Sequence, residues 1–556
     1  MRIFHPLAAL ALVAAAAAQD AESWRSSLYP QDWTPGFQDD AGRFLHDFSY
    51  AGYWRGERPI PDAPANGAER LADAVAEFGA DPSGESDSTA AIQAALDAVG
   101  EAGGGIVYLP AGTYRLAPRG DDPYALWIRN NHVILRGAGP GVTFLYNDTP
   151  RMRGREIIRV APRNAASWTT VLANTTVRLA EGYAQPTLRL KLASVDGLAE
   201  GDWIVVRSNA TEEFLAEHQM TGWWTTARQP GPTFYRQIVA IDAENAEIRI
   251  DAPTRYPLLP RDNARIYKTR AHIEGVGLED FSIGNAESKL TGFGEEDYTR
   301  NGTGAWEVHG AHAIVFRQAV FGWARRIHTY QPAGNESGVH LVSNGILLNQ
   351  TRGITVEDCV FENPQYRGGG GNGYGFTLQG NENLLRNNTA NRQRHAFDFK
   401  SMTASGNVIL RCRSNNPSLP SDFHMHLSMA NLLDNLTLDG DYIDATVRPY
   451  GTPDYHGVTT TQSVFWNTHG LRYMNNRPYV VNSQQHGWGY VIGTRGPADR
   501  VRTAPFSFRY TSPVASTVDT APEDFVEGAG RGDTLLPASL YEDQFARRTA
   551  QHAADH

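Results

Sequence analysis

Three short segments between residues 374 and 428 fix the architecture of this chain, because each alternates large apolar and polar side chains in the same order. They read Phe376-Thr377-Leu378-Gln379, Phe397-Asp398-Phe399-Lys400 and Phe423-His424-Met425-His426. A period of two is typical of a β-strand that buries one face. The segments recur after 21 and 26 residues, and a second short apolar strand follows each, at 384–385, 408–410 and 432–433. A strand, a turn and a second strand at this spacing predict the coils of a solenoid.

A second informative stretch lies near the N-terminus. It contains Val75-x-x-Phe78-Gly79-Ala80-Asp81 and Gly84-x-x-Asp87-Ser88-Thr89. A predicted amphipathic helix then runs to about Val99, and a strand and turn follow over 106–114. This stretch resembles the N-terminal part of the pectate-lyase-like superfamily, in particular the rhamnogalacturonase/epimerase-like motif.

The resemblance implies an all-β fold, a single-stranded right-handed parallel β-helix, and the predicted helix is expected to cap its N-terminal end. The alternating segments at 188–192, 201–206 and 248–251 are separated by turn signals, so we expect an antiparallel β insertion there. The superfamily contains lyases, hydrolases, epimerases and adhesins, and fold alone therefore assigns no function.

The chain divides into six predicted parts. Residues 1–18 combine Arg2, an apolar run and small terminal residues, which is typical of a secretory signal peptide. The other parts are an extended leader (19–68), the first β-helix coils (69–150), the β-rich insertion (151–270), the β-helix body with the active-site face (271–516), and a C-terminal tail (517–556). The tail contains a predicted helix over 539–552, which we expect to cap the open end of the solenoid.

Composition narrows the classes of partner. The net charge of −11 disfavours nucleic-acid binding, although a local basic groove could still hold an anionic glycan. No segment after the signal peptide is apolar over about 18 residues, so we expect a secreted protein, periplasmic or extracellular, without a membrane span. Cys359 and Cys412 are the only cysteines; a disulfide is permitted outside the cytosol, but stacked buried thiols are the favoured interpretation.

The polar positions of the three segments predict an outward patch. If the coils stack in register, Thr377, Asp398 and His424 form one row, and Gln379, Lys400 and His426 form the next. Further residues lie at the strand corners around the patch: Tyr374, Arg394, His395, Asp422 and His456.

The residues of this patch match the needs of β-elimination from a uronic acid. The reaction requires cationic groups beside the substrate carboxylate, a base for the C5 proton and an acid for the leaving oxygen. We expect Lys400 or a patch histidine to be the base and Arg394 with its neighbours to offset the carboxylate. Cationic neighbours would lower the pKa of a lysine enough for this role. The predicted function is therefore a polysaccharide lyase acting on an acidic polymer.

Two alternatives remain open at this stage. A glycoside hydrolase on the same fold would use two carboxylates about 5–9.5 Å apart, and Asp398 and Asp422 are the candidates. A non-catalytic glycan-binding or adhesive β-helix would not need lysine and two histidines on adjacent coils. Trp223 and Trp224, on a long loop of the insertion, could form a sugar-stacking wall or a self-packed loop core.

Metal binding is a weaker expectation. His424-x-His426 could bind a metal ion together with Asp398 or His456, but a two-histidine spacing alone is a weak signal. Calcium is the divalent cation to consider, and it would require more carboxylates than this patch offers. No cofactor is certain from the sequence.

Overall fold

The computed structural model describes residues 22–63, 66–68, 70–449, 451–497, 500–504 and 522–554. The predicted signal peptide lies outside the described residues. Within them, no helix is both long and apolar enough to cross a membrane.

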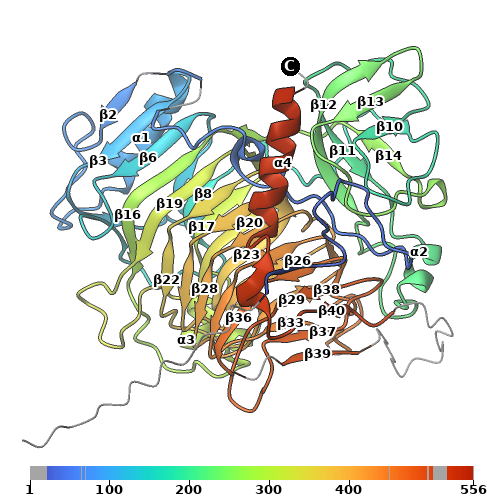
Figure 1. Cartoon of the computed structure of the whole chain (residues 1–556). Helices are drawn as coiled ribbons and strands as arrows, with labels where there is room; N and C mark the ends of the chain where they lie inside the picture. The colour runs from blue at the N-terminus through green and yellow to red at the C-terminus, as the bar shows by residue number, and fades with distance from the viewer. Residues whose placement is uncertain are drawn as a thin grey trace, which may run out of the picture.

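The body of the molecule is a parallel β-helix whose coils each contribute strands to three sheets (Figure 1). All strands of the sheet that carries the predicted patch pair in parallel. Its order is β5 (Tyr124–Ile128), β8 (Glu156–Val160), β17 (His312–Arg317), β20 (Asn344–Arg352), β23 (Tyr374–Asn381), β26 (His395–Lys400), β29 (Ser421–Met425), β33 (Ile443–Ala445), β37 (Val481–Ser483) and β39 (Val501–Thr503).

Two further ladders of parallel strands complete the coils. The first comprises β2 (Leu71–Asp73), β3 (Gly105–Leu109), β6 (Val133–Gly137), β16 (Gly277–Asn285), β19 (Trp323–Thr329), β21 (Thr355–Glu357), β24 (Leu384–Arg386), β27 (Val408–Leu410), β31 (Leu432–Asp434), β35 (Val464–Trp466), β38 (Tyr490–Ile492) and β40 (Phe525–Glu527). The second comprises β4 (Gly112–Leu116), β7 (Thr143–Asn147), β22 (Val360–Glu362), β25 (Thr389–Asn391), β28 (Arg413–Asn415), β32 (Thr437–Asp439) and β36 (His469–Arg472), with the long strands β16 and β19 serving both ladders. The predicted right-handed parallel β-helix is confirmed.

Stacks of identical side chains hold neighbouring coils together. Phe376 stacks on Phe397 with ring centroids 5.4 Å apart, and Phe399 stacks on Phe423 at 4.6 Å, as the alternating pattern predicts. Asparagines form a second stack, in which the side chain of Asn383 donates to Asn407 and that of Asn407 donates to Asn431. Such ladders satisfy buried backbone and amide groups at corresponding corners of successive coils.

The two cysteines belong to this interior. Both thiols are free and buried, which confirms the interpretation as structural thiols. Burial raises the pKa of each thiol to about 12, so neither forms a reactive thiolate near neutral pH.

The antiparallel insertion is present, but it begins later than residue 151. β8 (Glu156–Val160) pairs in parallel with β5 and β17 and therefore belongs to the solenoid. The insertion's sheet contains β9 (Val177–Arg178), β10 (Arg189–Lys191), β11 (Trp203–Arg207), β12 (Thr233–Asp242), β13 (Glu247–Ile250) and β14 (Arg265–Tyr267), and a short helix α2 (Glu212–Glu217) lies between β11 and β12. The segment Ile157-Ile158-Arg159-Val160 suits a strand of either sheet, so sequence alone placed the boundary too early.

The leader and the C-terminal helix pack together on one side of the solenoid. Helix α4 (Leu540–Ala554) lies along the coils that contain β27 and β31, where Glu542 pairs with Arg411 and the Tyr541 amide donates to Asp434 (Figure 1). The expectation that this helix caps the open end is therefore wrong, because its apolar face covers side-wall residues instead. The leader runs beside it, and the amide of Phe48 donates to Gln544.

The N-terminal helix α1 (Thr89–Glu101) exists where the sequence predicts it. It buries Ile92, Leu96 and Val99 in the main core next to the first strands. Its role as a cap stays a prediction. The short elements outside this framework are β1 (Trp24–Arg25), β15 (Ile273–Glu274), β18 (Ala319–Val320), β30 (Ser428–Met429), β34 (Thr460–Thr461), β41 (Leu535–Leu536), α3 (Gly304–Val308) and the 3₁₀ turns η1 (Tyr53–Gly56), η2 (Pro260–Asp262), η3 (Asp297–Thr299) and η4 (Gly532–Thr534).

Candidate active site

The register of β26, β29 and β33 places three aspartates in one row. Asp398 pairs with Asp422, and Asp422 pairs with Asp444, while Thr377 precedes them on β23. The sequence-based row of Thr377, Asp398 and His424 is therefore wrong at its third member. The phenylalanines set the register, since Phe399 pairs with Phe423 and the residue before each is an aspartate.

The second predicted row also differs from the structure at its third member. A bulge after Phe399 pairs Lys400 with Met425 rather than with His426. β29 ends at Met425, and His426 has a φ of 59°, so the chain turns there and the alternation stops. His426 consequently faces a different segment, where its Nε2 lies 2.8 Å from the Asp454 carbonyl oxygen.

Seven side chains converge where β23, β26 and β29 lie side by side, and we call them the polar cluster. They are Tyr374, His395, Asp398, Lys400, Asp422, His424 and Arg448. Asp422 is its most connected member: Oδ2 lies 3.2 Å from His395 Nδ1 and 3.1 Å from His424 Nδ1, and it accepts a hydrogen bond from Arg448. Burial opposes ionisation of Asp422, but Arg448 and the two histidines hold its pKa well below the usual range.

His424 can present either a lone pair or a proton to the open side of the cluster. Its Nδ1 lies 3.1 Å from Asp422 Oδ2 and 2.7 Å from Arg448 Nη1, and the two contacts require opposite tautomers because Arg448 can only donate. With the proton on Nδ1, Asp422 accepts it and Nε2 is a base. With the proton on Nε2, the same atom is a donor. Burial keeps the pKa of His424 well below 6.5, so the ring is neutral near pH 7.

Tyr374 is the neighbour that His424 faces. The Tyr374 hydroxyl lies 3.4 Å from His424 Nε2, and the ring stacks on His395 with centroids 4.8 Å apart. Burial raises the pKa of Tyr374 well above 10, and the nearby aspartates add to the shift, so the phenol keeps its proton. His395 Nδ1 donates to the Pro420 carbonyl oxygen at 2.6 Å, and burial lowers the pKa of His395 to about 4.

Lys400 and Asp398 form an ion pair on the other side of the phenol ring. Lys400 Nζ lies 3.1 Å from Asp398 Oδ2 and 3.6 Å from the centroid of the Tyr374 ring. The nearest charge to the lysine is thus a carboxylate, which differs from the cationic surroundings expected from the sequence. Burial raises the pKa of Asp398 to about 7, Lys400 opposes that shift and Asp422 adds to it. Two adjacent aspartates therefore hold different protonation states near neutrality.

Several other predicted residues lie outside the cluster. Arg394 is close to Tyr374, but its guanidinium is paired with Glu295 at 2.8 Å. Gln379 lies further along β23, where its carbonyl oxygen accepts a hydrogen bond from Thr403. His456 is nearer, with its ring centroid 5.1 Å from that of His424.

The two tryptophans of the insertion hold a hairpin over the cluster. Trp223 and Trp224 are each only 2% exposed, so the structure realises the self-packed loop core rather than a sugar-stacking wall. Their indole N–H groups donate to the carbonyl oxygens of Tyr455 and His456, both at 2.8 Å. The segment that contains Tyr455 and His456 continues to Gly457, whose backbone forms an antiparallel bridge with that of Arg448. The insertion thereby positions Arg448.

Residues 74–172 match the family model for rhamnogalacturonase A/epimerase, pectate lyase-like proteins. This confirms the resemblance recognised in the N-terminal motif. Among curated proteins, the chain is 55% identical over 73 residues to mannuronan C5-epimerase AlgE3 of Azotobacter vinelandii, which covers 13% of this chain and 4% of that protein. It is 45% identical over 71 residues to alginate lyase 7 of the same organism, covering 13% and 8%. The matches thus span a small part of each relative.

Similar solved structures extend over more of the chain. The A-module of Azotobacter vinelandii mannuronan C5-epimerase AlgE4 aligns with a TM-score of 0.33 and 14% identity, over 77% of this chain and 89% of that one. The ORF18 protein of Geobacillus virus E2 aligns with a TM-score of 0.40 and 12% identity, over 77% and 57%.

The sequence pattern did not identify two residues at the site. They are Arg448, a member of the polar cluster, and Asp444, the third aspartate of the row. A signal for Asp444 was present, because Phe397-Asp398-Phe399, Ser421-Asp422-Phe423 and Ile443-Asp444-Ala445 repeat an aspartate between two core positions. Arg448 lies in an irregular hairpin after β33, and no periodic pattern marks it.

Three side chains of the cluster have the spacing of a metal site, and the expected divalent cation stays a prediction. Ligand atoms of His395, Asp422 and His424 lie within 4.8 Å of one another, and this nitrogen-rich set does not suit calcium. Arg448 already supplies a positive charge to Asp422 and His424, and His395 Nδ1 is bonded to Pro420. The predicted pair His424-x-His426 is separated by the turn at His426.

Proposed function

We propose that this chain is a carbohydrate-active enzyme that removes the C5 proton of a uronate unit in an acidic polysaccharide and expels the 4-linked sugar by β-elimination. The observation that carries the proposal is the convergence of a neutral imidazole, a protonated phenol and an ammonium group: Tyr374 lies 3.4 Å from His424 Nε2 and its ring lies 3.6 Å from Lys400 Nζ. These are the three kinds of group that the reaction requires.

His424 is the base in this proposal. Its low pKa leaves the ring unprotonated near neutrality, and the tautomer with the proton on Nδ1 directs the Nε2 lone pair outward. Asp422 stabilises the imidazolium that forms when the ring takes the C5 proton. Because Lys400 is held beside a carboxylate, it serves better as a cation for the substrate carboxylate than as the base predicted alongside it.

Tyr374 is the proton donor to the leaving oxygen. A phenol whose pKa is raised by burial remains protonated at neutral pH and can donate as the C4–O bond breaks. His424 then returns the proton across the 3.4 Å contact, which restores both groups. Asp398 is inaccessible to solvent and acts through Lys400. When neutral, with a pKa of about 7, it leaves the ammonium group free to bind the substrate carboxylate, whereas the ionised form competes for that group.

The same geometry supports hydrolysis less well. Asp398 and Asp422 pair directly in the sheet, and their side chains are fully buried, so they do not flank a space for a glycosidic bond. Asp422 is also held by three other side chains, which leaves it no freedom to act as a nucleophile.

C5 epimerisation is a second candidate, and a specific observation favours it. Most of the similar curated proteins are mannuronan C5-epimerases, whereas one is an alginate lyase. Both reactions begin when a base removes the C5 proton of a uronate. They differ in the next step, since elimination expels the neighbouring sugar and epimerisation returns a proton to the opposite face.

The test uses the full chain and a panel of uronate polymers that includes mannuronan. Elimination produces the ultraviolet absorbance of an unsaturated uronate at the new chain end. Epimerisation in deuterated water produces deuterium at C5 without new ends. New reducing ends without that absorbance would establish hydrolysis, and binding without any change would establish a non-catalytic glycan-binding protein. Either of these last outcomes would overturn the proposal.

A further inference from the structure

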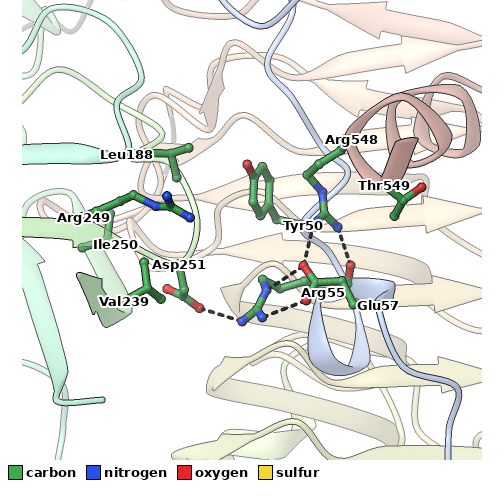
Figure 2. A pocket seen from close by; sticks show the side chains of 10 residues that line it. All are labelled: Tyr50, Arg55, Glu57, Leu188, Val239, Arg249, Ile250, Asp251, Arg548 and Thr549. Carbon is green, nitrogen blue, oxygen red and sulfur yellow. Dashed lines mark hydrogen bonds and ion pairs between the residues drawn. The ribbon is translucent and has the colours of Figure 1, made fainter. Parts of the chain in front are cut away.

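A cleft opens between the leader, the insertion and helix α4 (Figure 2). The segments that form it are distant in sequence from the strands of the polar cluster. Two adjoining cavities of about 380 and 310 Å³ share Tyr50, Leu188, Arg249 and Arg548 in their walls. This size is sufficient for a sugar unit, since small-molecule sites occupy about 300–1,000 Å³. Figure 2 shows Arg249 reaching from β13 across the cavity toward Tyr50.

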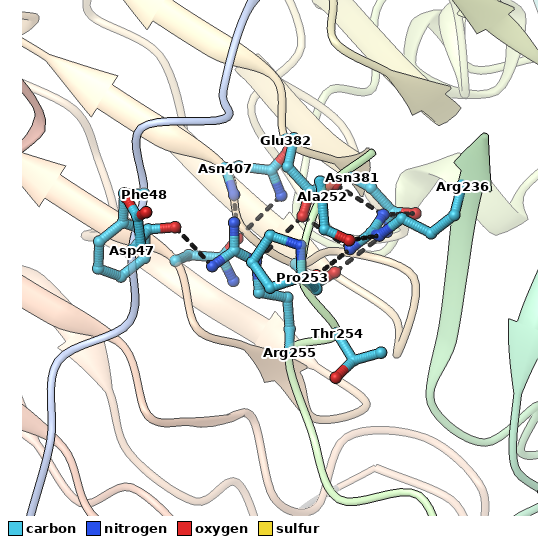
Figure 3. A network of polar contacts seen from close by, with 12 residues as sticks. Asp47, Phe48, Arg236, Ala252, Pro253, Thr254, Arg255, Asn381, Glu382 and Asn407 are labelled. Atoms are coloured by element: carbon cyan, nitrogen blue, oxygen red, sulfur yellow. Dashed lines mark hydrogen bonds and ion pairs between the residues drawn. The ribbon is translucent and has the colours of Figure 1, made fainter. Parts of the chain in front are cut away.

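A buried network of ion pairs joins the segments that form the cleft (Figure 3). Arg236 of the insertion and Arg255 both bind Glu382 of the solenoid, at 2.9 and 3.0 Å, with all three side chains inaccessible to solvent. Arg255 also donates to the backbone oxygen of Asp47 in the leader. Three segments distant in the sequence are therefore fixed against one another, and the cleft does not need to be assembled when a ligand arrives.

The cleft is positively charged in a negatively charged protein. Five arginines but only three carboxylates line the two cavities, whereas the chain as a whole carries −11. Glu57 serves two of the arginines, since it binds Arg55 at 2.8 Å and Arg548 at 2.6 Å. The local charge favours an anionic ligand.

Among the arginines that line the cleft, Arg249 is the one available to bind an anionic ligand. In the antiparallel pair of β10 and β13 it lies directly opposite Arg189, an arrangement that is destabilising unless an anion offsets it. Arg189 is paired with Glu247 at 2.7 Å. The guanidinium of Arg249 has no hydrogen-bond or ion-pair partner among the residues that the structure describes.

We propose that this cleft is a second binding site for the acidic polysaccharide, in which Arg249 binds the carboxylate of a uronate unit and Tyr50 provides the adjacent wall. This inference rests on the proposed function for the class of ligand, but the site is separate from the polar cluster. A uronate carboxylate can form two parallel hydrogen bonds with a guanidinium, which neutral sugars cannot do.

The experiment measures equilibrium binding to the full chain carrying Lys400→Ala, so that no turnover is required. The probes are a hexamer of β-1,4-linked mannuronate and the mannose hexamer with the same linkage. Adding Arg249→Gln should weaken binding of the acidic hexamer about three- to tenfold at low salt, the effect of one partly exposed charged hydrogen bond. The difference should shrink as salt rises. The neutral hexamer should bind both proteins equally weakly.

Arg163→Gln is the matched control, because Arg163 is an exposed arginine that lines neither cavity. It should leave binding unchanged, and the acidic hexamer should slow hydrogen exchange in residues 544–551 of α4. Equal affinity of the parent and Arg249→Gln for the acidic hexamer would overturn the proposal. Loss of affinity for both hexamers would do the same, because it would show a structural effect. If no uronate polymer is turned over but Arg249→Gln still weakens binding, the proposed function fails and the cleft assignment stands.

Discussion

Replacing Arg448 by methionine removes the cation that neutralises Asp422. Both side chains are buried, with exposed fractions of 6% and 0%, and Asp422 would retain only neutral histidines as partners. Breaking a buried pair on one side costs about 3–5 kcal/mol, because a carboxylate is left uncompensated in a low-dielectric interior. We expect Arg448→Met to lower the free energy of unfolding by this amount. Turnover should also fall, since His424 loses one of the contacts that orient it.

Urea unfolding of the full chain, followed by tryptophan fluorescence, measures this loss. The double variant Arg448→Met with Asp422→Asn is the informative comparison, because it removes both charges and should recover most of the stability. Arg448→Lys should lose less than the methionine variant. If the single and double variants unfold at the same urea concentration, the loss does not come from an unpaired Asp422, and the reasoning about the cluster is refuted.

Three further predictions concern the same cluster. His424→Ala and Lys400→Ala should each reduce turnover at least about 100-fold without changing the β-sheet circular dichroism spectrum; activity that survives both changes would place the active site elsewhere. Since Asp398 has a pKa of about 7 and its ionised form competes with the substrate for Lys400, activity should fall as pH rises through about 7, and Asp398→Asn should abolish this fall; an unchanged pH profile would contradict its assignment. Trp224→Phe removes the hydrogen bond from the indole to the His456 carbonyl oxygen and should lower the free energy of unfolding by about 1–3 kcal/mol, measured with urea; no change would show that the indole N–H does not hold the hairpin.

Much of the fold could be predicted from the sequence because a β-helix repeats one local pattern. Alternation at Phe397 and Phe399 identifies an inward face, and asparagines at corners identify the turns. The right-handed winding of the β-helix was predicted from the resemblance of the N-terminal motif to the pectate-lyase-like superfamily. Helix α4 was located correctly, but its docking side was not, because an apolar helix face covers any apolar surface and the sequence does not say which one.

The site was predicted in part, for reasons that are visible in the strands. Tyr374, His395, Asp398, Lys400 and His424 were all named from their spacing and do meet in the structure. The predicted register failed in two places. Phe423 pairs with Phe399 rather than with Phe397, which moves the partner of Asp398 by two residues, and the bulge after Phe399 then pairs Lys400 with Met425 instead of His426. Long-range contacts such as that of Arg448 depend on hairpin geometry, which carries no periodic signal.

Release of the C5 hydrogen into water tests whether this polar cluster performs proton abstraction on a uronate. Mannuronan labelled with deuterium at C5 is incubated with the full chain, and the label that appears in the solvent is followed over time, with His424→Ala as the control. The proposed chemistry predicts that label is lost as fast as product forms, and that the variant releases none. Product that retains its C5 deuterium would contradict both elimination and epimerisation.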